Sequence, residues 1–216
     1  MDPNPETHYF DDPTVASDPV VVDVMLPDTA FTMTTDRGVF SRGHLDAGTN
    51  LLLRSDAPLA SNGDLLDLGC GSGPIALTMA RRSPDATVWA VDVNERARTL
   101  TADNAARNGI TNLRVAHPAD VPADVRFTSI WSTPPTRIGK PALRALLLGW
   151  LARLDDDGTA ALVVQKHLGA DSLQRWLKFE GHPCERIASK SGFRVLTVAA
   201  GRPPGADAPP SDAAPR

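Results

Sequence analysis

The sequence predicts an α/β protein: a seven-stranded, mostly parallel sheet with one antiparallel strand, helices on both faces, and an additional N-terminal strand pair. Three observations carry this prediction. Short apolar segments alternate with helical patterns through the middle of the chain. A glycine-rich stretch, residues 69–73, directly follows the first central strand. The final two strands share a short link around Gly192, so they must be antiparallel.

Each element has its own local signal. Pro74 at the first turn starts one helix, and Gly109 closes the next. We expect the central strands at 64–69, 87–92, 112–116, 127–132 and 159–165, and the helices at 74–82, 95–108, 140–154 and 172–179. The last strand pair is expected at 187–189 and 193–199. The N-terminal pair is expected at 20–25 and 30–35, with a turn at 26–29.

Length and composition limit the classes of protein that this chain represents. Its 216 residues suit one domain with appendages. We expect an N-terminal extension and strand pair over 1–60, a core over 61–200, and a disordered Pro/Ala/Gly-rich tail over 201–216. Two cysteines favour a reducing compartment, and the chain shows no signal peptide and no apolar run long enough to span a membrane. These features predict a cytoplasmic protein.

The net charge of −4 initially argues against a nucleic-acid partner, but it is unevenly distributed. Residues 1–30 contain seven Asp and Glu and no Lys or Arg. Residues 126–194 contain eleven Lys and Arg and only six Asp and Glu. The acidity therefore belongs largely to the N-terminal stretch, and an RNA partner stays compatible with the mildly basic second half.

The strongest motif is Asp67–Pro74, DLGCGSGP, at the end of the first central strand. Its glycines let the backbone turn tightly and approach a ligand. Asp92 ends the next strand, where a carboxylate accepts hydrogen bonds from ribose hydroxyls. A dinucleotide site prefers G-x-G-x-x-G, and Asp67 would repel a pyrophosphate. The sulfonium and α-ammonium groups of S-adenosylmethionine suit Asp67 better, so we predict this cofactor.

With these motifs, the chain resembles class I S-adenosylmethionine-dependent methyltransferases, specifically the small-domain group typified by ribosomal RNA small-subunit guanine-N2 methyltransferases. The resemblance runs from about residue 8 to about residue 200. It is carried by the glycine loop and by the segments GVFS at 38–41, LDAGT at 45–49, VDVNERA at 91–97, NAARNG at 104–109, STPPTRIGK at 132–140, KHLGA at 166–170 and GFRVL at 192–196. It implies a Rossmann-like methyltransferase fold.

The resemblance also implies site residues. The implied cofactor-binding residues are Asp67, Gly69, Cys70, Gly71, Gly73, Asp92, Asn94, Asp120 and Ser132. The implied catalytic residues are Thr133, Pro134 and Pro135, and the implied substrate-binding residues are Tyr9, Phe40, Arg137 and Lys140. Cys70 is more simply a small packed residue. His117 and His167 have no Cys or His partner at ligand spacing, so we predict no metal.

The chain departs from this group at two positions. The group uses Asn-Pro-Pro to accept hydrogen bonds from a base amine, and this chain has Thr133-Pro134-Pro135. The group usually has Phe-Asp at the start of the preceding strand, and this chain has Phe127-Thr128. In addition, Thr136 cannot stack on a base.

These departures leave more than one function open. The first hypothesis is methylation of an exocyclic base amine, guanine N2, in ribosomal RNA of the small subunit. The second is a cofactor-binding protein with a degenerate catalytic motif that acts in RNA binding or assembly. A third is a methyltransferase for a small molecule or a protein amide. The sequence favours a monomer without deciding the oligomeric state.

Overall fold

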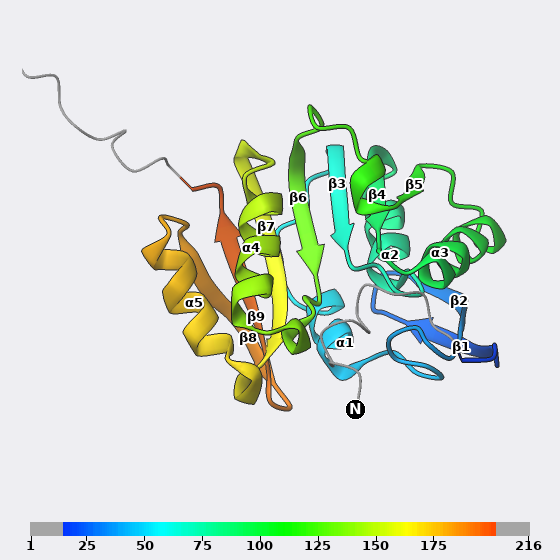
Figure 1. The fold of residues 1–216 in the computed structure, drawn as a ribbon. Coiled ribbons are helices and arrows are strands. Elements are labelled where there is room, and N and C mark those ends of the chain that lie inside the picture. Colours follow the sequence, from blue (N-terminus) through cyan, green and yellow to red (C-terminus); the bar gives the residue numbers. More distant parts are fainter. Residues whose placement is uncertain (1–14, 202–216) are drawn as a thin grey trace, which may run out of the picture.

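The computed structural model describes residues 15–201 and contains two sheets (Figure 1). β1 (Val20–Met25) and β2 (Ala30–Thr35) form an antiparallel pair. The main sheet has seven strands in the order β5-β4-β3-β6-β7-β9-β8. Only β9 runs against its neighbours β7 and β8. The fold class expected from the sequence is thus confirmed.

The elements follow one another in the expected alternation. The strands of the main sheet are β3 (Asn62–Leu68), β4 (Asp85–Val91), β5 (Leu113–Ala116), β6 (Phe127–Ser132), β7 (Leu154–Gln165), β8 (Cys184–Lys190) and β9 (Phe193–Ala199). The helices are α1 (Ala47–Leu53), α2 (Pro74–Arg82), α3 (Glu95–Arg107), α4 (Lys140–Leu151) and α5 (Ala170–Phe179). Three short 3-10 turns are η2 (Pro118–Asp120), η3 (Thr136–Ile138) and η4 (Lys166–Leu168).

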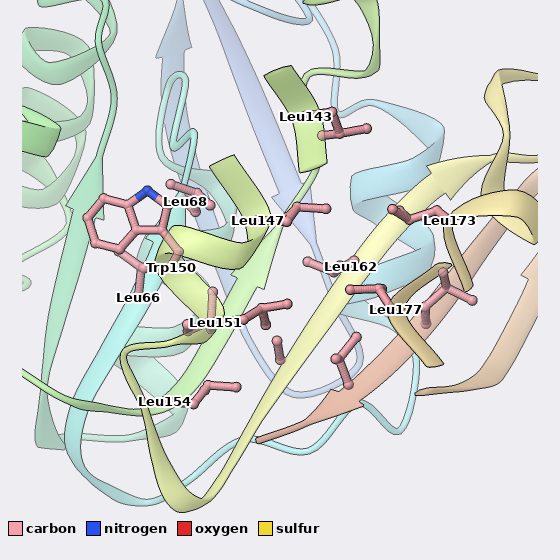
Figure 2. Packing of buried hydrophobic residues seen from close by; sticks show 14 of the residues in the cluster. Leu66, Leu68, Leu143, Leu147, Trp150, Leu151, Leu154, Leu162, Leu173 and Leu177 are labelled. Atoms are coloured by element: carbon pink, nitrogen blue, oxygen red, sulfur yellow. The ribbon is translucent and has the colours of Figure 1, made fainter. Parts of the chain in front are cut away.

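Two buried clusters cover the two faces of the main sheet. One contains apolar residues of α4, α5 and alternate strand positions, including Leu66, Leu147 and Leu177 (Figure 2). The other contains residues of α1, α2 and the β1–β2 pair. Leu65 and Leu66 belong to different clusters because successive strand residues point to opposite faces. Burial on both faces explains why these strands are apolar runs rather than alternating patterns.

Several element boundaries differ from the sequence-based expectation. α4 ends at Leu151 rather than at residue 154, because buried Leu154 already pairs with Phe127 as the first residue of β7. β7 and β8 are longer than expected, and α5 begins two residues earlier than expected. α1 was not predicted: its seven residues depend on the Asp46 cap and on the complete burial of Leu52 and Leu53. Such tertiary contacts leave little local signal.

Sheet order determines where a ligand site can form. β3 lies between β4 and β6, so the chain runs outward from β3 through β4 to β5 on one side and then returns to β6 on the other side. Leu68 at the end of β3 pairs with Ser132 at the end of β6. The glycine loop and the Thr133-Pro134-Pro135 segment therefore emerge side by side at the carboxyl edge, where ligands bind in open α/β sheets.

Candidate active site

The glycine loop joins β3 to α2 and is tied to the neighbouring strand. The backbone N–H groups of Gly69 and Cys70 donate to the carbonyl of Val91 at 2.8 and 3.1 Å. Gly73 has φ of +92°, and a Cβ on it would lie 2.8 Å from Leu77 Cδ1. The tight turn into α2 thus requires glycine at this position.

Asp67 lies beneath this loop with no exposed surface. Its Oδ2 accepts from the N–H of Ala76 at 2.9 Å, and its Oδ1 is buried without a hydrogen-bond partner. Burial is the main cause that raises the pKa of Asp67 to about 8, and the nearby charge of Asp92 adds to this. The carboxyl is therefore a buried acceptor with spare capacity for a donor or a cation.

Asp92 and Asn94 connect the ends of two strands to α3. The two carboxylate oxygens of Asp92 accept from the N–H groups of Gly71 and Asn94 at 3.0 and 2.9 Å. Burial raises the pKa of Asp92, and those hydrogen bonds oppose the shift. Asn94 caps α3 through Ala97 N–H and donates its side-chain amide to the carbonyl of Gly38.

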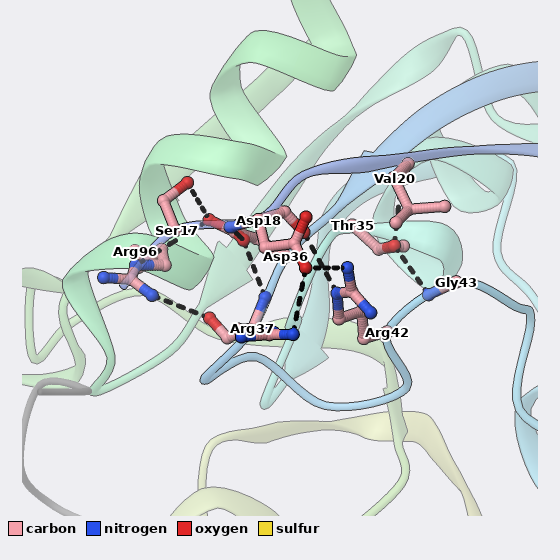
Figure 3. A network of polar contacts seen from close by, with 9 residues as sticks. All are labelled: Ser17, Asp18, Val20, Thr35, Asp36, Arg37, Arg42, Gly43 and Arg96. Carbon is pink, nitrogen blue, oxygen red and sulfur yellow. Dashed lines mark hydrogen bonds and ion pairs between the residues drawn. The ribbon is translucent and has the colours of Figure 1, made fainter. Parts of the chain in front are cut away.

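Gly38 belongs to a loop, residues 36–44, that forms another wall of the site. Asp36, which is almost fully buried, accepts hydrogen bonds from the Ser17 hydroxyl and the N–H groups of Asp18 and Arg37 (Figure 3). These bonds and the Arg96 guanidinium 3.9 Å away outweigh desolvation and lower the pKa of Asp36. The polar network thereby fixes the loop that carries Phe40.

The segment after β6 faces this loop. The Ser132 hydroxyl is buried and donates to the carbonyl of Leu68 at 2.7 Å, which joins the ends of β6 and β3. The Oγ1 atoms of Thr133 and Thr49 lie 3.2 Å apart. Pro135 then precedes η3. The tripeptide is thus held between the sheet edge and α1.

Residues from the glycine loop, the 36–44 loop, α1 and the segment after β6 line one cavity of about 780 Å³. A volume of this size suits a nucleoside-sized ligand with room for a second group. Its lining includes the predicted residues Gly69, Cys70, Gly71, Asp92, Asn94, Phe40, Thr133, Pro134, Pro135 and Arg137. The fold therefore brings these predicted residues, which lie far apart in the chain, together around one cavity.

The remaining predicted residues do not line this cavity. Asp67, Gly73 and Ser132 lie just behind its wall. Exposed Asp120 ends η2 outside the cavity lining. Lys140 lies at the start of α4 in a small depression that shares Leu168 with the cavity. Tyr9 lies outside the described residues.

Sequence reasoning did not single out several lining residues. They are Val15, Met33, His44, Asp46, Thr49, Gln165, Leu168 and Phe193, among others. Asp46 and Thr49 were within a motif that matched the methyltransferase group, but nothing local indicates that they reach the cavity. Gly48 places them there, because a Cβ on Gly48 would lie 2.6 Å from the Phe193 ring.

Among residues 15–201, neither a reactive thiolate at Cys70 nor a metal centre finds support. Burial raises the pKa of the Cys70 thiol well above its usual value, so Cys70 stays neutral. No group of three or more His, Cys, Asp or Glu that could hold a metal ion occurs in this range. In the same range, no helix is long and apolar enough to cross a membrane.

Comparison with known proteins identifies the family. Residues 30–197 match the family described as Methyltransferase small domain. The chain belongs to this family. S-adenosylmethionine is therefore its cofactor, and methyl transfer is its class of reaction.

Two relatives of this methyltransferase are covered to different extents. It is 34% identical over 194 residues to the uncharacterized protein YbxB of Bacillus subtilis, covering 88% of this chain and 96% of that protein. It is 37% identical over 174 residues to ribosomal RNA small subunit methyltransferase C of Aeromonas hydrophila, covering 78% of this chain and 49% of that protein. The methyltransferase thus spans about half the length of its ribosomal RNA methyltransferase relatives.

A solved structure has the same fold. The T. thermophilus 16S rRNA N2 methyltransferase, in complex with AdoMet and guanosine, superposes with a TM-score of 0.73 at 22% identity. The match covers 88% of this chain and 52% of that chain. At this identity the likeness establishes the shared architecture.

The residues of the cavity fit the cofactor. The cofactor is cationic, and two carboxyl groups, Asp67 and Asp92, lie at or behind the cavity wall. The unpartnered Oδ1 of Asp67 leaves an acceptor free beside the glycine loop. The lining offers both apolar surface and polar groups, as a nucleoside requires.

Proposed function

We propose that this methyltransferase methylates an exocyclic amine of a base, guanine N2, in ribosomal RNA of the small subunit. The observation that carries the proposal is the meeting of the glycine loop with Thr133, Pro134 and Pro135 at one cavity. The names of the half-matching relatives and the guanosine in the similar solved structure support this choice of substrate.

The cofactor and the substrate then occupy different parts of the cavity. Asp67 and the glycine loop hold the methionine end of the cofactor, and Asp92 and Asn94 hold its ribose. S-adenosylmethionine, when bound, supplies a methyl group already activated on a sulfonium. The protein's task is to align the amine with that methyl group.

The Thr133-Pro134-Pro135 tripeptide makes the substrate amine a better nucleophile. An exocyclic amine is a weak nucleophile because its lone pair is delocalised into the ring. The Thr133 hydroxyl and the Pro134 carbonyl accept hydrogen bonds from its two N–H groups, which favours a tetrahedral nitrogen with a localised lone pair. Proline brings no competing N–H and stiffens the segment.

Further residues contact the rest of the nucleotide. Phe40 is 62% exposed within the cavity lining, and its ring offers a stacking surface in place of Thr136. Arg137 at the cavity and Lys140 beside it contact phosphates. Among residues 15–201, Arg137 and Lys140 are not in the ion pairs that tie up Arg37, Arg42, Arg82, Arg96 and Arg194.

The second departure from the family pattern does not weaken this site. The Thr128 hydroxyl donates toward the carbonyls of Asn62 and Asp64 at 3.1 and 3.2 Å, at the end of β6 opposite the cavity. A Cβ on Gly63 would lie 2.9 Å from Thr128 Cγ2. Thr128 therefore joins two strands away from the cavity, so this departure is not itself a sign of a degenerate active site.

The test is transfer of labelled methyl from S-adenosylmethionine to small ribosomal subunits purified from cells that lack this gene. We expect the wild type to label the RNA on a guanine, Thr133→Ala to lose at least about tenfold in rate, and Thr133→Asn to stay active. Labelling by Thr133→Asn alone would instead support a degenerate site. Labelling of ribosomal protein or small molecules would contradict the RNA substrate.

A further inference from the structure

Thr49 contacts the proposed acceptor Thr133, so the role of Thr49 rests on the proposed function. The Oγ1 atoms of Thr49 and Thr133 lie 3.2 Å apart, although 84 residues separate them in the sequence. Both residues line the cavity. The distance and the chemistry of two hydroxyl groups allow either one to donate. The direction of this hydrogen bond decides what Thr133 presents to a substrate.

A threonine hydroxyl without a second partner can either donate or accept a hydrogen bond. It carries one proton and two lone pairs. If its proton faced the cavity, it would bond to the lone pair of the amine and block the attack on the methyl group. A carboxamide oxygen, as in the Asn-Pro-Pro pattern, has no proton and avoids this conflict. A threonine needs a second group that takes its proton away from the substrate.

We propose that Thr49 is this positioning residue: it accepts the hydroxyl proton of Thr133, so that Thr133 turns only lone pairs toward the substrate amine. With its proton held by Thr49, the Thr133 hydroxyl acts only as an acceptor, as a carboxamide oxygen does. Thr49 acts through Thr133 and does not itself contact the reacting atoms.

The surroundings of Thr49 suit this role because they hold the backbone of this residue in place beside Thr133. Thr49 is only 4% exposed, and its N–H donates to Asp46 Oδ2 at 3.0 Å. The next turn of α1 buries Leu52 and Leu53 completely. On the other side, Gly48 packs so closely on the Phe193 ring that a Cβ at this position would lie 2.6 Å from it.

The test compares Thr49→Val, Thr49→Ser and a double variant, with methyl transfer to small ribosomal subunits as the assay. Valine removes the hydroxyl at nearly constant shape, and serine keeps it. We expect Thr49→Val to lower kcat by about tenfold with KM and cofactor affinity unchanged, and Thr49→Ser to stay within about threefold of wild type. Thr197→Val, on β9 away from the cavity, controls for a generic loss of a threonine hydroxyl.

The double variant tests whether Thr49 acts through Thr133. In a Thr133→Asn chain the amide oxygen needs no proton acceptor, so adding Thr49→Val should change kcat by less than about twofold. An unchanged kcat in Thr49→Val, an equal loss in Thr49→Ser, or the same loss in the Thr133→Asn background would each overturn the inference. Absence of transfer by the wild type would instead overturn the proposed function, and the role of Thr49 with it.

Discussion

Asp67 accepts a hydrogen bond from the backbone N–H of Ala76 at 2.9 Å while its other carboxylate oxygen is buried without a partner. A single hydrogen bond does not compensate for removing a carboxylate from water. Burial therefore raises the pKa of Asp67 to about 8. Two pH-dependent properties follow from this arrangement, one of the protein alone and one of cofactor binding.

The stability of the protein without ligand should fall as pH rises from about 4 to about 8. The unfolded carboxyl titrates near its ordinary pKa of 3.8, so between the two values folding takes up a proton. The stabilising contribution is complete below about 4 and is lost as pH rises through about 8. Asp67→Asn should remove an effect on the order of 3 kcal/mol between pH 5 and pH 8. Urea unfolding at both values measures it; identical pH profiles for the two proteins would contradict the buried, shifted carboxyl.

Cofactor binding should release a proton at neutral pH. A cationic ligand beside Asp67 favours the carboxylate, so affinity for S-adenosylmethionine should rise with pH toward about 8 and then level off. Titration calorimetry in two buffers with different ionisation enthalpies measures the proton release. In Asp67→Asn the affinity should be lower and the pH dependence over this range lost. A pH-independent affinity in the wild type would refute the linkage.

Gly73→Ala should destabilise the protein more than Gly109→Ala. Both glycines have positive φ, which costs an alanine about 1 kcal/mol. A Cβ at Gly73 also meets Leu77 and Thr101 at 2.8 to 3.0 Å, whereas one at Gly109 meets nothing within 4 Å. We expect Gly73→Ala to cost about 2 kcal/mol more and to weaken cofactor binding. Equal unfolding midpoints for the two variants would count against this packing.

Phe40→Ala should weaken the substrate complex and spare cofactor affinity. Loss of a stacking ring removes about 1–3 kcal/mol, so KM for ribosomal subunits should rise about tenfold. Phe179→Ala is the matched control, because this ring is 87% exposed on α5. If both variants show the same KM, Phe40 does not contact the base.

Arg137→Gln and Lys140→Gln should each lower RNA affinity and reduce its dependence on salt. Each phosphate contact contributes about one unit to the slope of log affinity against log salt. Arg126→Gln removes the same charge next to the start of β6, at the opposite end of the sheet, and should leave the slope unchanged. Equal slopes for all three variants would show that the basic residues near the cavity do not bind phosphate.

The sequence by itself determined the order of the elements and the chemistry of the cofactor loop. Strand and helix periodicities are local, and so is a glycine run between a buried strand and a Pro74 helix start. Asp67, two residues before the first glycine of this loop, favours a cationic cofactor over a pyrophosphate. Family motifs then extended the expectation to Thr133 and Phe40.

Only the tertiary structure decided which of these residues meet. The pairing of β3 with β6 brings Leu68 beside Ser132, and the packing of α1 on Phe193 brings Thr49 to Thr133. In the folded structure, Asp120 lies outside the cavity, and Thr128 joins two strands at the far end of the sheet. Such contacts depend on strand order and side-chain packing between segments 60 to 150 residues apart. No local pattern records them.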